Sequence, residues 1–474
     1  IGIHNYIFNN IYKEINKKEE ENIFIDCDSV LERLKFGITN QKRYKEIISK
    51  LLVDINKKYS KNFYIKYEIT ASFSLNNFNL FISKSSPAKL ILVITDDDYN
   101  EDRHDIIIGN LINIIENYEN NIFGFDFDCN NVLYSRKAFL KNFLDKLNKS
   151  FANLEYIRIT CKLINFFIVN EIYKFLSNNY KIIEIHSDDD SENDYEKFTS
   201  LFQKIKTNLK PTELKIITEY TEYSESNYFD SKGEEHENVL YLNGIGTIKK
   251  LELDKIYNFC QLDCKAAQSL NYLYINHTFI DYKESNIDFS NLKYLTIKDT
   301  ILKGVLNFKN INFNSFSNLE HLSVDILATV DFFILKELLK SIANKLIEFN
   351  ITNANELETS YDEDYYNYFL KEEKIEEKEE EDMEEDEMGI ELESEFEKKI
   401  NKISEEFGEI MLGLKNLKYL RIYQFDFCPF IKILLERYMN ENLIEFESDC
   451  ICLSSTKLFL KNNPNIIKLN LLDG

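Results

Sequence analysis

The chain has no tryptophan, and its 474 residues include only 12 glycines and 4 prolines. So few glycines and prolines argue against a turn-rich all-β sandwich, and they leave little material for a glycine-rich loop that cradles phosphate groups. A membrane-spanning helix needs about 20 consecutive apolar residues, and the sequence contains no run of that kind. We therefore expect a chain without a membrane span and without a nucleotide-binding loop.

An excess of basic charge is also lacking, since the net charge is −24. Residues 371–397 carry 16 acidic and 3 basic side chains, and residues 356–370 add five acidic ones with no lysine or arginine. These two stretches supply −18 of the net charge and leave about −6 for the rest of the chain. Binding of nucleic acid through a basic face is therefore not expected.

Motifs of catalysis and of metal binding are missing as well. The six histidines are dispersed, and there is no His-Glu-x-x-His, Walker A or Gly-x-Gly-x-x-Gly pattern. The eight cysteines lack the doubled C-x₂₋₄-C spacing of zinc sites. We interpret them as free structural thiols, with a metal site or disulfides as the alternatives. The sequence thus predicts a protein that is not an enzyme and that holds no cofactor and no metal.

What the sequence does contain is a repeated hexamer with apolar residues at its first, fourth and sixth positions, often preceded by asparagine. It is nearly identical at residues 291–297 and 416–422, with close variants at 270–275 and 319–324. Candidate hexamers start at residues 122, 154, 180, 211, 248, 270, 292, 319, 346, 417, 443 and 466. Each hexamer predicts a short strand whose first, fourth and sixth side chains enter the core.

Between the hexamers, apolar residues recur at helical spacing, as in Leu335, Leu338, Leu339 and Ile342. This alternation predicts four segments. Residues 1–120 are degenerate N-terminal repeats or a cap, with a separate domain as the alternative. Residues 121–353 and 409–474 are repeats, and residues 354–408 are an acidic insertion that we expect to be disordered, with a helical C-terminal part.

The hexamers and their spacing resemble the leucine-rich repeat superfamily, specifically its irregular intracellular members, such as the repeats of F-box/leucine-rich-repeat proteins. The resemblance implies an α/β solenoid shaped as a curved horseshoe. A parallel β-sheet would line its concave face, and helices and short turns its convex face. It also implies protein binding, without naming the partner.

The third and fifth residues of each hexamer should point out of the core onto the concave face. Tyrosine and arginine at such positions are typical anchors of protein interfaces, although tyrosine also suits any strand surface. We predict a contiguous column of Tyr272, Tyr294 and His321 on adjacent strands. The full set of candidate partner-binding residues is Tyr156, Arg158, Tyr272, Tyr274, Tyr294, His321, Tyr419 and Arg421.

The sequence therefore predicts a non-catalytic scaffold that binds a protein on its concave face. One alternative is a substrate-recognition subunit of an F-box-type ubiquitin ligase. Another is an acidic chaperone that holds a basic protein, such as a histone, through the insertion. Reduced thiols favour an intracellular protein, cytoplasmic or nuclear, but the chain begins at Ile1, so that a signal peptide lost upstream is also compatible with the sequence.

Deletion of the acidic stretch provides a first test of this organisation. Removing residues from about 360 to 395 should leave the melting temperature nearly unchanged, because a charged, unpacked loop makes few contacts and loop length costs little free energy. Thermal unfolding followed by circular dichroism measures the effect. A fall in melting temperature comparable to that of a core substitution would contradict the prediction.

Overall fold

In the computed structural model the chain divides into two compact units, an N-terminal unit, Ile1–Glu234, and a C-terminal unit, Glu235–Gly474. The structure describes residues 22–26, 62–68, 89–94, 101–128, 154–161, 180–187, 211–218 and 240–242. Between residues 248 and 471 it describes all except 257–259, 279, 283–286, 301, 303–304, 307–310, 328, 354–401, 403–404, 425–428 and 450–452. The sequence also has apolar residues at helical spacing between residues 44 and 55, and aspartate clusters at 96–98 and 188–190. These three segments lie outside the described residues.

The described part of the N-terminal unit contains an open parallel sheet whose strands follow one another in chain order. One long helix, α5 (Glu101–Tyr118), and the 3₁₀ turn η1 (Glu119–Asn121) connect β3 to β4. The strands are β1 (Asn22–Asp26), β2 (Asn62–Glu68), β3 (Lys89–Ile94), β4 (Ile122–Asp128), β5 (Tyr156–Cys161), β6 (Ile182–Ser187) and β7 (Glu213–Thr218).

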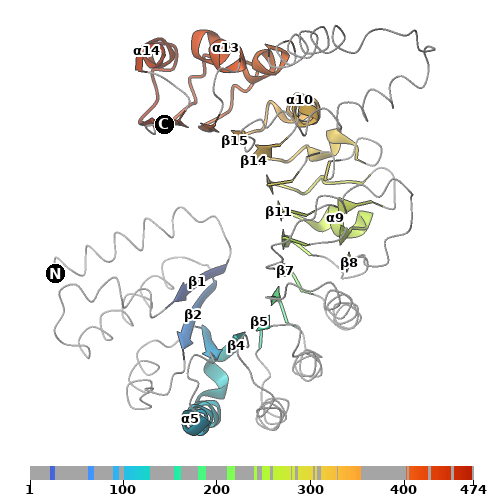
Figure 1. The fold of residues 1–474 in the computed structure, drawn as a ribbon, viewed down its shortest axis with the longest axis vertical. Helices are drawn as coiled ribbons and strands as arrows, with labels where there is room; N and C mark the ends of the chain where they lie inside the picture. The colour runs from blue at the N-terminus through green and yellow to red at the C-terminus, as the bar shows by residue number, and fades with distance from the viewer. Residues whose placement is uncertain are drawn as a thin grey trace, which may run out of the picture. The chain divides into compact units, whose positions relative to one another are not determined.

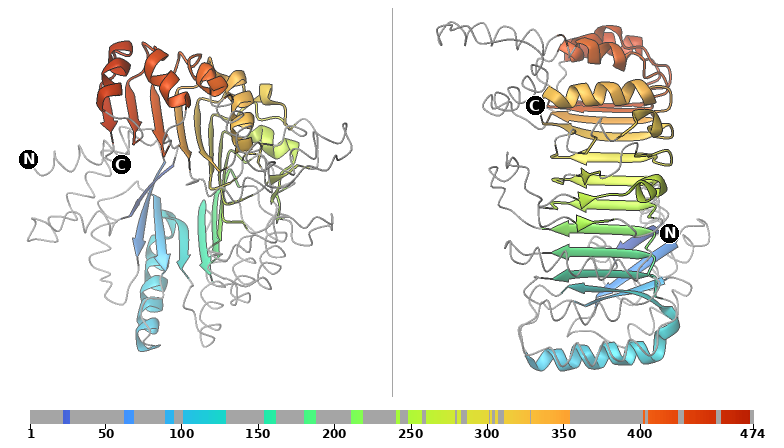
Figure 2. Two further views of the ribbon diagram at one scale, coloured as in Figure 1. Left: turned by 45° about the horizontal axis from the view of Figure 1, so that its top comes forward. Right: turned by 90° about the vertical axis from the view of Figure 1, so that its right-hand side faces the viewer.

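The C-terminal unit also has a parallel sheet in chain order (Figures 1 and 2). Its strands start at residues 250, 272, 294, 321, 348, 419, 445 and 468, which reproduces the spacing of the hexamers. They are β9 (Lys250–Asp254), β11 (Tyr272–Asn276), β13 (Tyr294–Lys298), β14 (His321–Ile326), β15 (Glu348–Asn353), β16 (Tyr419–Tyr423), β17 (Glu445–Ser448) and β18 (Lys468–Leu471). An open parallel sheet with connecting helices confirms the solenoid-like α/β arrangement.

The labelled helices of the C-terminal unit lie on one side of this sheet (Figure 1). They are α9 (Cys264–Ser269), α10 (Thr329–Ile342), α13 (Pro429–Arg437) and α14 (Leu453–Asn462). A 3₁₀ turn, η6 (Phe313–Phe316), precedes β14. Where successive strands start only 22 residues apart, a full helix does not fit. The two 22-residue intervals contain the short strands β10 (Cys260–Gln261) and β12 (Ile280–Asp281). With β8 (Leu240–Tyr241), which precedes β9, they form a second small parallel sheet that the sequence did not predict.

The core lies between the main sheet and the helices, and it is made of the residues that the hexamers place inward. Burial alternates along each strand: on β11, Leu273 and Ile275 are buried while their neighbours are half-buried. Leu295 and Leu322 pair across β13 and β14, and each is 1% exposed. The predicted register is therefore confirmed for these two leucines.

The asparagine that precedes many hexamers has a defined structural role. Its side-chain amide donates a hydrogen bond to a backbone carbonyl of the preceding repeat. Ser269 makes the same kind of bond, to the carbonyl of Ile248. The asparagine amide thereby satisfies a backbone carbonyl of the preceding repeat at the turn into the strand, in place of water, and connects the two repeats. The asparagine pairs are Asn291 with Gln268, Asn318 with Ser290, Asn416 with Asn344, Asn442 with Lys415, and Asn465 with Glu441.

The exit from the strands is also repeated. The first residue after β9, β11, β13 and β16 has a positive φ, between 40° and 61°, although none of these residues is glycine. Two threonines brace the turns, since Thr278 Oγ1 accepts from the Ile256 amide and Thr300 Oγ1 accepts from the Thr278 amide. The backbone therefore leaves these strands through a non-glycine residue in the left-handed conformation, and side-chain hydrogen bonds stabilise the turn.

Residues 405–411 are helical and pack against α10. Phe407 is fully buried and meets Phe332 edge to face, with ring centroids 5.6 Å apart, and Met411 is also buried. Lys336 of α10 forms an ion pair of 2.9 Å with Glu406. The sequence predicted a helix in this part of the chain from the apolar spacing that ends at Phe407. Most of residues 354–404 lies outside the described residues.

Candidate functional site

The face of the C-terminal sheet that is turned away from the labelled helices (Figure 1) is here called the helix-free face, and its side chains lie in straight rows. The rows follow from the parallel register, which sets equivalent positions of all repeats side by side about 4.8 Å apart. The first row contains Lys250, Tyr272, Tyr294, His321, Glu348, Tyr419, Glu445 and Lys468. The second contains Glu252, Tyr274, Thr296, Ser323, Asn350, Arg421, Glu447 and Asn470.

Aromatic rings occupy the first half of the first row. The rings of Tyr272 and Tyr294 are 6.1 Å apart, and Tyr294 stacks on His321 with centroids 4.3 Å apart and planes 13° from parallel. Lys250 Nζ lies 4.9 Å from the centre of the Tyr272 ring, within range of a cation–π contact. The column of Tyr272, Tyr294 and His321 that the sequence predicted is therefore present, and all three side chains are half-buried.

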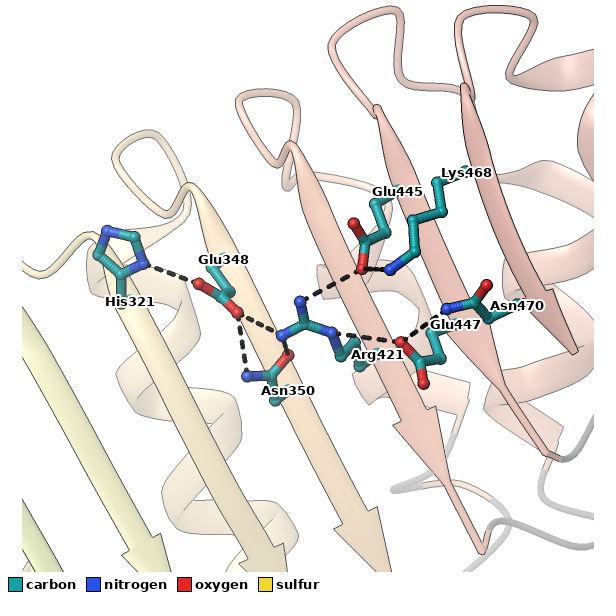
Figure 3. A network of polar contacts seen from close by, with 8 residues as sticks. All are labelled: His321, Glu348, Asn350, Arg421, Glu445, Glu447, Lys468 and Asn470. Carbon is teal, nitrogen blue, oxygen red and sulfur yellow. Dashed lines mark hydrogen bonds and ion pairs between the residues drawn. The ribbon is translucent and has the colours of Figure 1, made fainter. Parts of the chain in front are cut away.

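Charged side chains continue the same row (Figure 3). His321 Nδ1 lies 3.0 Å from Glu348 Oε2, and Glu348 is paired with the Arg421 guanidinium. Arg421 lies on the second row and also contacts Asn350, Glu445 and Glu447 at 3.2–3.6 Å. Lys468 Nζ completes the network, at 2.8 Å from Glu445. One guanidinium thus joins four strands, β15 to β17 directly and β14 through Glu348.

This network favours the ionised form of Glu348. The hydrogen bond with His321 and the charge of Arg421 lower the pKa of Glu348 from 4.5 to about 2, although burial acts in the opposite direction. A carboxyl group whose pKa is depressed on folding stabilises the folded state above its unfolded pKa. That stabilisation is lost as the pH falls through the folded value.

A pH series tests the assignment. At neutral pH, Glu348→Gln should be less stable than the wild type, and this difference should shrink as the pH falls from about 4.5 toward 2, because the wild-type carboxylate is then protonated as well. Urea unfolding at each pH gives the difference. Glu441→Gln, a change at an exposed site, serves as the control. A stability gap that stays constant down to pH 2 would show that Glu348 is not held ionised by its partners.

Tyr274, in the second row, lies in negatively charged surroundings. Burial and then the carboxylates of Asp254, Glu252, Asp299 and Asp325 raise its pKa to about 12. Burial, and the nearby charge of Asp299, also raise the pKa of Asp325. Tyr274 itself is half-buried.

The prediction that Tyr156 lies exposed on the sheet face is wrong. Tyr156 is fully buried and packs with Ile91 and Ile182, with Phe123 against the cluster. The reason is Gly124, the residue paired with Tyr156 on the neighbouring strand β4. A Cβ atom at Gly124 would lie only 2.7 Å from Tyr156 Cβ and 2.9 Å from Cδ1, so the missing side chain makes room for the ring.

Arg158 lies two residues further along β5 and is half-buried. Its guanidinium is 3.2 Å from Asp126, a carboxylate whose side chain is 2% exposed, and 3.9 Å from Glu184. Lys66 Nζ also lies 2.9 Å from Asp126. Arg158 therefore neutralises a buried acid of its own unit, as a structural ion pair does.

The remaining predicted residues, Tyr274, Tyr419 and Arg421, lie with Tyr272, Tyr294 and His321 on the helix-free face of the C-terminal unit. Sequence reasoning missed the carboxylates that hold Arg421. Their signal was available, because Glu348, Glu445 and Glu447 occupy the third or fifth positions of the hexamers that start at Leu346 and Leu443. Among the residues at those positions, the sequence prediction includes only tyrosine, histidine and arginine.

Comparisons with known proteins add no family, since no protein-family model and no curated protein matches the chain. Among the residues that the structure describes, no group of three or more histidine, cysteine, aspartate or glutamate side chains is arranged to hold a metal ion. No helix within the described ranges is long and apolar enough to cross a membrane.

Proposed function

We propose that the chain is a leucine-rich-repeat-like solenoid that serves as a non-catalytic scaffold and binds a partner protein on the helix-free face of its C-terminal unit. Three features support the repeat assignment. The hexamers place side chains 1, 4 and 6 in the core, the strands pair in register, and the helices lie on the other side of the sheet. In this proposal the helix-free face is the concave face of a curved solenoid.

The observation that carries the binding proposal is the row formed by Tyr272, Tyr294 and His321, which continues into the Arg421 network. Tyrosine and arginine anchor protein interfaces because they bring a large contact area with a polar tip and few rotatable bonds. Here the rings are held against one another, and Arg421 is held by three carboxylates. A surface whose side chains are already ordered loses little conformational entropy on binding.

Site-specific photo-crosslinking tests the proposal. Benzoylphenylalanine is placed at position 272 or 294, where it replaces a tyrosine of similar shape, and the purified chain is irradiated in an extract of the source cells. We expect one discrete covalent adduct from both positions. Matched variants carry the probe at Phe333 or Leu458, exposed residues of α10 and α14 on the opposite side. Adducts of equal yield at all four positions, or none at 272 and 294, would refute binding on this face.

A further inference from the structure

The helix-free face of the C-terminal unit carries more negative than positive charge on its strands. Its outward positions include six carboxylates, Glu252, Asp254, Asp325, Glu348, Glu445 and Glu447, against four cations, Lys250, Lys298, Arg421 and Lys468. The cations are not evenly spread. Arg421 and Lys468 lie against Glu348, Glu445 and Glu447, at the end of the face distant in sequence from Tyr274.

Negative charge is concentrated instead around Tyr274. We call Tyr274, Glu252, Asp254, Asp299 and Asp325 the Tyr274 cluster. Four carboxylates act on one tyrosine there. Their partners include Lys250, 3.0 Å from Glu252, and His277, 3.7 Å from Asp299. Asn276 donates a hydrogen bond to Asp254, the Asp299 amide donates one to Asp325, and Lys298 is exposed nearby. The carboxylates therefore exceed the fixed cations at this point of the face.

The chain itself shows how a cation is accommodated on this surface. Lys250 places its ammonium group over the Tyr272 ring at 4.9 Å and against the Glu252 carboxylate at 3.0 Å. An aromatic face and a carboxylate act together on one cation, which is the arrangement that most favours a lysine or arginine side chain at a protein surface. Tyr274 offers the same pair of groups, a ring and adjacent carboxylates, one row further along the sheet.

On the side away from Glu252, the residues that follow Tyr274 in its own row are small. Thr296 and Ser323 follow it on β13 and β14, and they have the least bulky side chains of the second row. A long side chain that approaches from the open face therefore meets little bulk on the β13 side of the Tyr274 ring.

We propose that the Tyr274 cluster is the recognition point for an arginine or lysine side chain in a basic segment of the partner protein. This inference rests on the proposed function and adds the chemistry of the partner. The partner's cation approaches the Tyr274 ring and pairs with Asp299 and Asp325, so charge complementarity, in addition to the aromatic column, selects what binds.

Fluorescence anisotropy with a labelled peptide of alternating arginine and glycine tests the proposal at about 0.15 M salt, where long-range attraction is screened. The matched peptide carries citrulline, which has the same shape without the charge. The full chain should bind the arginine peptide and not the citrulline peptide. Equal binding of the two peptides, or no binding of either, would overturn the inference.

The acidic run at residues 371–397 also attracts basic peptides, so the variants must separate the two sources. Asp299→Asn with Asp325→Asn keeps the hydrogen-bonding shape and removes two charges, and it should weaken binding roughly tenfold. Glu372→Gln with Glu373→Gln removes two charges from the acidic run and should change binding less than about twofold. Tyr274→Leu should also weaken binding, whereas Phe333→Leu, at an exposed aromatic residue of α10, should not. A loss that is equal for the two double variants would assign the binding to the acidic run.

Circular dichroism melting checks that each variant is folded. The peptide-binding result is independent of the photo-crosslinking result. One outcome is that adducts form at positions 272 and 294 while the arginine and citrulline peptides bind equally. In that case the helix-free face binds a partner, but it does not recognise a cation of that partner. If no adducts form either, the proposed function fails as well.

Discussion

Leu322→Ala should lower the free energy of unfolding by about 2–5 kcal/mol, the range found for leucines truncated in well-packed cores. Leu322 is 1% exposed, and its neighbours on the adjoining strands, Leu295 and Phe349, are equally buried. A cavity in this layer cannot close easily, because the strands on both sides are fixed by backbone hydrogen bonds. Urea unfolding of the wild type and the variant measures the loss, and Leu295→Ala should give a similar value.

The matched control is Lys298→Ala, an exposed position at the end of β13. It should change the free energy of unfolding by less than about 0.5 kcal/mol, as surface substitutions usually do. If Leu322→Ala had an effect as small as the control, the inward register of the hexamers would be wrong.

Replacement of both Tyr272 and Tyr294 by alanine should abolish detectable binding of the partner that photo-crosslinking identifies. Truncation of an interface anchor costs about 2 kcal/mol or more, which weakens binding roughly thirtyfold for each residue. The fold should survive, because both side chains point away from the core and the inward Leu273 and Leu295 are unchanged. Isothermal titration calorimetry measures the dissociation constants, and the melting temperature confirms the fold.

A second double variant, Phe333→Ala with Leu458→Ala, removes comparable apolar area from the helical side, where both residues are about 40% exposed. Its affinity should match that of the wild type. Equal losses of affinity in the two double variants would show that the tyrosines act through stability and not through contact.

The strand positions could be predicted from the sequence because the repeat carries its own register. Residues 1, 4 and 6 of the hexamers in the C-terminal unit are apolar, apart from the buried Ser448, so the strands of its main sheet begin where the pattern places them. The same reasoning brought Tyr272, Tyr294 and His321 into one column, since parallel strands in register align equivalent positions.

What the sequence could not provide are the features that depend on a neighbouring repeat. Tyr156 has the predicted strand position, but beside Gly124, 32 residues earlier, its ring is buried on its face of the sheet instead of exposed. The three carboxylates around Arg421 come from strands β15 and β17, and their convergence depends on rotamers as well as register. The small sheet β8–β10–β12 consists of two-residue strands, which carry no periodic signal.

The central claim is that the partner is held by the helix-free face of the C-terminal unit. The most direct test titrates the partner that photo-crosslinking identifies into two variants. One is Tyr272→Ala/Tyr294→Ala, and in the other the acidic residues between 372 and 387 are replaced by their amides. Loss of binding in the tyrosine variant, with near wild-type affinity in the neutralised one, is the expected result. Normal binding by the tyrosine variant, together with loss in the neutralised one, would contradict the claim and assign the partner to the acidic run.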